Sequence, residues 1–105
     1  MLVVKRVEAE VEGELVYECY ENGVKVGRVV ARFRSEGGLE ARLFDTSKRE
    51  AGRTLMAKLE RDAAANGVEK LYFGARDEKE RDEFLPGGYE PVEEGSLQLY
   101  KRLRG

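Results

Sequence analysis

The chain has 105 residues, of which 38% are charged, with 21 acidic against 19 basic side chains. This length predicts one domain over residues 1–105 with a single hydrophobic core, and the near balance of charge argues against a dedicated nucleic-acid binder. The chain has no His and a single Cys, so it lacks the usual general base, the usual metal ligands and any internal disulfide. We therefore predict no metal site.

No apolar run approaches the length of a membrane span, and the apolar start Met1–Val4 is interrupted by Lys5 and Arg6. We expect a cytoplasmic protein with no membrane partner. The high content of charge, with few amide side chains, is typical of heat-adapted proteins, because ion-pair networks become easier to desolvate as temperature rises.

Alternation of apolar residues predicts strands near residues 2–7 and 15–20, joined by a turn. Asn22-Gly23 then predicts a type I′ hairpin turn, because both central positions of that turn require φ > 0. A third strand is predicted over residues 24–34, with Val26 sharing a face with the arginines that follow it. Cys19 lies in the second strand and is expected to be a small buried core residue.

After Gly37-Gly38, residues 39–43 alternate as a fourth strand, and an amphipathic helix is predicted from about Arg49 to Asn66. Its apolar positions recur at helical spacing: Leu55, Met56, Leu59 and Ala63. A fifth strand over residues 68–73 makes this a right-handed crossover, so the fourth and fifth strands should be parallel.

A short polar helix near residues 77–84 and a final hairpin, turning at residues 93–96, complete the predicted order. The fold class is α+β: a mixed, mostly antiparallel sheet of about six or seven strands, with one main helix after strand four.

The loop before the main helix carries basic residues and Gly52, next to unpaired N–H groups and the positive end of the helix dipole. Such a helix start suits a phosphate or pyrophosphate. In this region the sequence resembles the GCN5-related N-acetyltransferase (GNAT) family, whose loop has the pattern (Arg/Gln)-x-x-Gly-x-(Gly/Ala). Residues 52–56 are similar to the family's Gly-x-Ala-Leu-Leu, and residues 84–92 are similar to its Phe-Tyr-x-x-x-Gly-Phe-x-Pro-Val.

The resemblance implies an acyl-CoA N-acyltransferase-like fold and a site for acetyl-CoA or CoA, with no other cofactor. The implied coenzyme-binding residues lie at the end of the fourth strand and in the loop and first helical turn: Leu43, Phe44, Lys48, Arg49, Ala51, Gly52, Arg53 and Thr54. Glu40 is the implied catalytic base. The implied acceptor is a small amine or a protein N-terminus.

Several positions depart from the family pattern. In the register that the helix favours, Glu50 replaces the first loop glycine and would face a pyrophosphate, and Ser47 replaces the Arg/Gln. Leu85 stands where the family has a general-acid tyrosine, and leucine cannot donate a proton. Glu78 replaces an Asn that contacts the coenzyme.

Three functions therefore stay open: a small acetyltransferase, a non-catalytic GNAT-like binding or assembly module, and an unrelated structural α+β domain. The losses at positions 50, 78 and 85 favour the non-catalytic module over the enzyme. We also predict a homodimer, because residues 27–30 and the final hairpin leave an apolar surface where the family usually has further helices.

Overall fold

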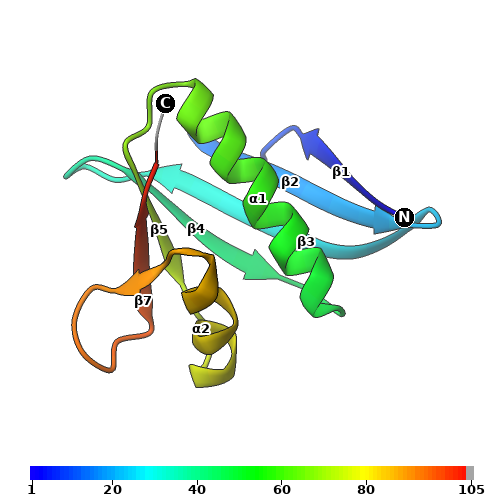
Figure 1. The fold of residues 1–105 in the computed structure, drawn as a ribbon. Helices are drawn as coiled ribbons and strands as arrows, with labels where there is room; N and C mark the ends of the chain where they lie inside the picture. The colour runs from blue at the N-terminus through cyan, green and yellow to red at the C-terminus, as the bar shows by residue number, and fades with distance from the viewer. Residues whose placement is uncertain (104–105) are drawn as a thin grey trace.

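The computed structural model describes residues 1–103 and forms one seven-stranded sheet in the order β1-β2-β3-β4-β5-β7-β6 (Figure 1). The elements are β1 (Leu2–Val7), β2 (Glu14–Glu21), β3 (Val24–Phe33), β4 (Leu39–Phe44), α1 (Arg49–Ala65), β5 (Lys70–Gly74), α2 (Glu78–Phe84), the 3-10 turn η1 (Leu85–Gly87), β6 (Glu90–Pro91) and β7 (Gln98–Arg102). Only β4 and β5 run parallel, and the other pairs are antiparallel. The predicted fold class is confirmed.

The hairpin between β2 and β3 forms where it was predicted. Asn22 and Gly23 have φ of 51° and 80°, as a type I′ turn requires. The prediction for Val26 was wrong: Val26 packs in the core, and its neighbour Gly27 also faces α1. A β-bulge opposite Cys19 and Tyr20 is the cause, because the extra residue interrupts the strict alternation of faces along β3.

Helix α1 lies diagonally across one face of the sheet, over β1, β2 and β3 (Figure 1). Its predicted apolar positions are all buried, together with Ala51 and Gly52, and Gly67 ends the helix with φ of 81°. Cys19 is fully buried among these contacts, and burial raises the pKa of its thiol. Cys19 is therefore a core residue and not an activated nucleophile.

The second helix covers the same face as α1. Phe84 of α2 packs on Phe73 of β5, with ring centroids 4.6 Å apart, and Phe73 belongs to the core that α1 covers. The opposite face of the sheet therefore carries no helix within residues 1–103. We call it the open face. No helix of this part of the chain is long and apolar enough to cross a membrane.

Two tyrosines tie α1 to the sheet through carboxylates. The Tyr17 hydroxyl donates to Asp62 Oδ2 at 2.6 Å, and the Tyr89 hydroxyl donates to Glu60 Oε2 at 2.9 Å. Glu60 also accepts from Lys101 Nζ at 2.6 Å. These bonds hold the middle and the second half of α1 in place, so that its first turn meets the end of β4 in a defined position.

Candidate functional site

The sheet opens at the end of β4. Pairing between β4 and β5 stops at Ala41 and Phe73, although β4 continues to Phe44. Gly74, the next residue of β5, pairs on its other side with Gln98 of β7. Residues 42–44 therefore have no partner strand on the β5 side. We call this unpaired stretch between the two strands the gap.

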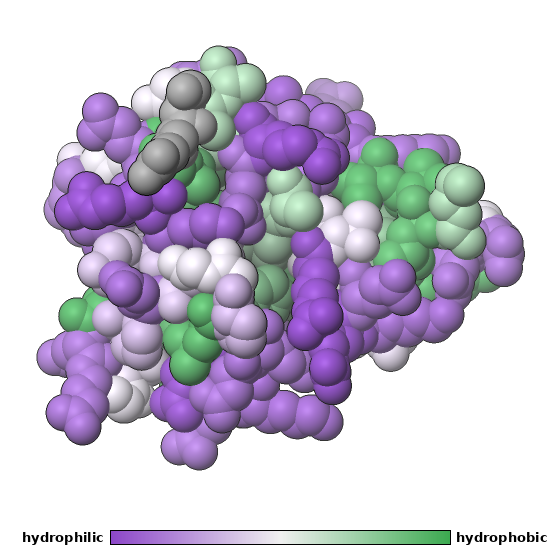
Figure 2. Space-filling view, in the orientation of Figure 1, coloured by the Kyte–Doolittle hydropathy of each residue, from purple (hydrophilic) through white to green (hydrophobic). Residues whose placement is uncertain are grey.

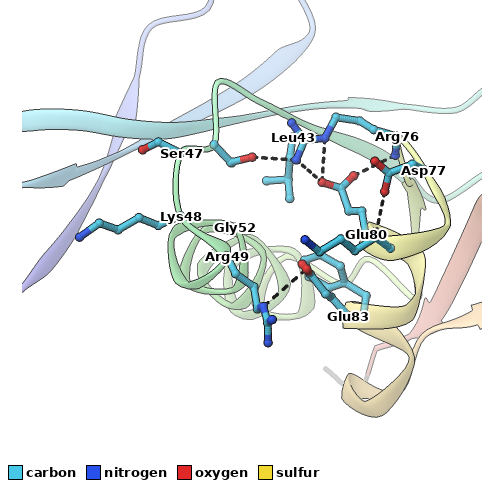
Figure 3. Close-up of a pocket in the computed structure, with 12 residues that line it drawn as sticks. Leu43, Ser47, Lys48, Arg49, Gly52, Arg76, Asp77, Glu80 and Glu83 are labelled. Atoms are coloured by element: carbon cyan, nitrogen blue, oxygen red, sulfur yellow. Dashed lines mark hydrogen bonds and ion pairs between the residues drawn. The ribbon is translucent and has the colours of Figure 1, made fainter.

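On the helix side of this gap lies a pocket of about 290 Å³ between the start of α1 and α2 (Figure 3). It is lined by residues from β4, from both helices and from the segments before them: Leu43, Thr46, Ser47, Lys48, Arg49, Gly52, Arg76, Asp77, Lys79, Glu80, Glu83 and Phe84. We call it the helix-side pocket.

The first turn of α1 is suited to an anion. No side chain caps the helix at Lys48, so N–H groups of the first turn are left without a side-chain acceptor, and Glu50 is the acidic residue of that turn. Gly52 lets the turn approach β4 closely, because an added Cβ would lie 3.0 Å from Leu43 Cδ1. The pocket therefore combines backbone N–H donors of α1 with a close contact between Gly52 and the side chain of Leu43.

Arg49 and Arg76 are paired with carboxylates of the pocket, and Lys48 is paired with Glu21 outside it. Arg49 Nε lies 3.5 Å from Glu83 Oε1. Arg76 donates from its backbone N at 2.9 Å and from Nε at 2.8 Å to Glu80, and from Nη2 at 2.9 Å to Thr46 Oγ1 (Figure 3). The hydrogen bond that Arg76 donates to Glu80, which is only 6% exposed, raises the pKa of Arg76 above its usual value. This network links the end of β5 to the loop before α1.

On the open face, the same gap borders a hollow of about 420 Å³. We call it the open-face hollow, and it is lined by Glu14, Arg28, Val30, Arg32, Glu40, Arg42 and Phe44. The guanidinium of Arg42 lies across Gly74, where an added Cβ would be 2.9 Å from Cζ. Glu40 accepts from Gln98 Nε2 at 3.0 Å. A glycine in β5 thus allows side chains of β4 to reach the gap.

The predicted coenzyme residues separate into groups. Leu43, Lys48, Arg49 and Gly52 come together in the helix-side pocket, whereas Phe44 lies with Glu40 in the open-face hollow. The others lie elsewhere: Ala51 is buried in the core, Thr54 donates to the Glu50 carbonyl at 2.8 Å, and Arg53 borders a separate depression with Tyr89 and Lys101.

Glu50 was expected to face a bound pyrophosphate, but it is exposed and does not line the helix-side pocket. The acidic side chains that do line it are Asp77, Glu80 and Glu83. Their positions follow from α2, which the sequence places but cannot orient. One local signal was present: the Asp77-x-x-Glu80 spacing is that of a capping box, and Asp77 Oδ1 accepts from the Glu80 backbone N at 2.8 Å.

The position of the family's general acid holds no proton donor. Leu85 lies in η1 and is partly exposed. Tyr89, four residues on, is committed to Glu60, and its burial raises the pKa of its hydroxyl. No group of three or more potential metal ligands occurs among residues 1–103.

No protein-family model and no curated protein matches this sequence. Solved structures match its fold. The IAA acetyltransferase from Bacillus cereus superposes with a TM-score of 0.78 at 15% identity, covering 98% of this chain and 100% of that one. A GNAT family acetyltransferase from Elizabethkingia anophelis, with acetyl-CoA bound, gives 0.74 at 12% identity, covering 97% and 98%.

A third similar structure is the KacTA–DNA complex, with a TM-score of 0.73 at 14% identity, covering 97% of this chain and 93% of that one. The fold of this chain is therefore the GNAT fold. Likeness at these identities defines the architecture and leaves the activity to be argued from the site.

Proposed function

We propose that this protein binds acetyl-coenzyme A in the helix-side pocket and transfers the acetyl group to a primary amine that enters from the open-face hollow. The observation that carries this proposal is that residues 42–44 pair with β3 but have no partner strand on the β5 side. Leu43 lines the pocket on one side of the sheet, and Arg42 and Phe44 line the hollow on the other. A donor and an acceptor bound on opposite sides would therefore meet across one strand.

The pocket residues fit the phosphates of the coenzyme. The uncapped start of α1 offers N–H groups and a favourable dipole, and Lys48, Arg49, Arg76 and Lys79 give four basic side chains against three acidic ones. Glu50 does not oppose binding from within the pocket, because it does not line it. The bound acetyl-CoA of the Elizabethkingia anophelis structure, which has the same fold, also supports the proposal.

When bound, acetyl-coenzyme A supplies the thioester carbonyl carbon, at which a C–N bond forms and the C–S bond breaks. The backbone N–H of Leu43 or of Phe44, whichever points to the unpaired β5 edge of β4, is the proposed donor to the carbonyl oxygen. Glu40 is the proposed base and takes the proton of the amine through water. Leu85 has no proton for the departing sulfur, so that proton comes from solvent and turnover is slow.

The proposal is tested by titrating the protein with coenzyme A and with acetyl-coenzyme A while amide shifts are recorded. We expect the largest shifts at residues 42–44 and 48–52, and we expect binding to weaken as salt rises. Arg49→Gln should weaken binding about threefold to tenfold, by removal of one charge-assisted contact. Arg53→Gln is the matched control on the same helix, outside the pocket, and should change it less than about twofold. Equal effects of the two variants would refute the pocket assignment.

A non-catalytic module is the second candidate, and the absence of a proton donor at Leu85 favours it. The two functions separate in one assay. Turnover of any amine with acetyl-coenzyme A establishes the enzyme, whereas coenzyme binding without turnover establishes the module.

We also propose that the protein is a homodimer. Gly27 does not contribute to a dimer surface as expected, because it is buried under α1. Apolar side chains instead gather at the end of the molecule that carries the N-terminus and the β2–β3 hairpin, where Met1, Val3 and Val24 are exposed (Figure 2). Light scattering should give twice the chain mass of 11.9 kDa, and a purely monomeric species would contradict the proposal.

A further inference from the structure

We propose that the open-face hollow selects an amine that carries a carboxylate close to its amino group, recognised by Arg28 and Arg42. This inference rests on the proposed function, because it names the acceptor class for the same site. It begins from the charges of the hollow, which contains three arginines and two glutamates.

Two of these charges are already neutralised by neighbours. Arg32 is ion-paired with Glu14 at the far end of the hollow from Phe44. Glu40 keeps its hydrogen bond to Gln98, which is uncharged, so its own negative charge remains. Arg42 has no ion pair among the described residues, and Arg28 has one long ion pair, to Asp45 at 3.8 Å, and lies opposite Glu18 in the β2–β3 ladder.

The Arg28 side chain is held in place by a ring contact, although one of its hydrogen-bond donors has no acceptor. Its Nε is buried and has no hydrogen-bond partner among residues 1–103. Its nearest carboxylate is that of Asp45, at 3.8 Å and mostly exposed, which is too long for a hydrogen bond. The guanidinium stands over the Phe44 ring, 5.2 Å from the centroid, and this contact orients it beside the hollow. A buried donor without a partner destabilises the protein, so an incoming acceptor that the guanidinium can turn towards is favoured.

Arg42 occupies the gap itself. Its guanidinium lies over Gly74, and no carboxylate of the described residues forms an ion pair with it. It is directly opposite Val30 in the β3–β4 ladder, between the pair Arg28 and Phe44 and the pair Arg32 and Glu40. The small side chain of Val30 leaves the centre of the hollow open between these charges.

The arrangement matches a zwitterion. Glu40 and Arg42 lie two residues apart on the same face of β4, about 7 Å along the strand, which places one negative and one positive group beside the gap. An amino group near Glu40 and a carboxylate near Arg42 and Arg28 would satisfy both. A simple alkylamine would leave Arg42 unpaired and Arg28 with only its long contact to Asp45, and the resulting preference for a carboxylate is the specificity that the site imposes.

L-Alanine and L-alaninamide are the probes, because a neutral carboxamide in the second replaces the charged carboxylate of the first. Each is titrated into the protein without coenzyme, and the side-chain Nε–H signals of the arginines are followed with the amide signals of residues 28–30 and 42–44. We expect L-alanine to shift the Arg28 Nε–H signal and to bind at least about tenfold more tightly than L-alaninamide, by one charge-assisted bidentate contact.

Arg28→Gln and Arg42→Gln should each abolish this preference. Arg28→Lys keeps the positive charge but loses the planar pair of N–H donors, so it should reduce the preference. Arg102→Gln is the matched control: Arg102 lies in β7, is exposed and does not line the hollow. The far-ultraviolet circular dichroism of each variant must match that of the native chain, and Arg28→Lys carries the test if Arg28→Gln does not fold. Equal binding of the two probes overturns the inference, even where coenzyme A binds the helix-side pocket. A preference for L-alanine without coenzyme binding supports the carboxylate site and removes the proposed acetyl transfer.

Discussion

The two faces of the same sheet carry opposite kinds of side chain, although they alternate along the same strands. In β4, Leu39, Ala41 and Leu43 are buried beneath the helices, whereas Glu40, Arg42 and Phe44 face outwards. The covered face supplies the apolar burial that holds the fold. The open face contributes less to that burial, so most of its positions can hold charged side chains. The difference teaches that folding and the proposed chemistry use alternate residues of the same strands.

The largest effect is expected from the covered face. Leu59 is fully buried against the sheet, so Leu59→Ala should lower the free energy of unfolding by about 2–5 kcal/mol, through lost burial and the cavity left behind. Chemical denaturation measures the loss. Val30→Ala, on the partly exposed open face, is the control and should cost less than about 1.5 kcal/mol. Comparable losses would show that the two faces do not differ as described.

A second substitution tests the contact between α1 and β4. Gly52→Val places a branched side chain where even a Cβ would lie 3.0 Å from Leu43 Cδ1. We expect a loss of about 1–3 kcal/mol in unfolding free energy, since the helix must move away from the strand. The same variant should bind coenzyme A more weakly than the native chain, as measured by isothermal titration. Unchanged stability would mean that the first turn of α1 is not held against Leu43.

The Tyr17–Asp62 hydrogen bond gives a pH dependence to the covered face. Burial raises the pKa of Tyr17 to about 12, with the Asp62 carboxylate adding to the shift. A raised pKa means that this stability is fully present below pH 10, the usual tyrosine value, and is lost as pH rises towards 12. The Tyr17 hydroxyl holds the pKa of Asp62 below its usual value, so a matching loss appears as pH falls through the acid range.

Tyr17→Phe removes both effects and should cost about 1–2 kcal/mol at neutral pH, because it breaks one hydrogen bond to a charged group. Denaturation midpoints measured from pH 3 to pH 12 would compare the variant with the native chain. The stability difference between the two proteins should narrow at both ends of this range. A constant difference would contradict the linkage.

The smallest effect concerns Glu50. Because Glu50 is exposed and does not line the helix-side pocket, Glu50→Gln should change coenzyme A affinity less than about twofold. Its stability cost should be about 0.3–1 kcal/mol, from the loss of a negative charge near the start of α1. A large gain in affinity would restore the sequence-based view that this carboxylate opposes the coenzyme.

The order of the elements, the main helix and both turns with positive φ could be predicted because their signals are local. Periodicity over several turns identified α1. Asn22-Gly23 marked the turn between β2 and β3, and Asn66-Gly67 marked the end of α1. The crossover rule gave the parallel pair β4 and β5. The bulge at Val26 was not predicted, since it depends on the register against β2, and its one local signal was Gly27 within the strand.

For the candidate site, the sequence alone determined which loop precedes the helix, and Leu43, Lys48, Arg49 and Gly52 of the predicted set line one pocket. Only the tertiary structure decided that Glu50 does not line this pocket, that Glu80 and Glu83 of α2 do, and that Arg28 and Arg42 share a hollow on the other side of the gap. The physical reason is distance along the chain. These residues meet through the packing of α2 on β5 and the pairing of β3 with β4, which local propensity does not encode.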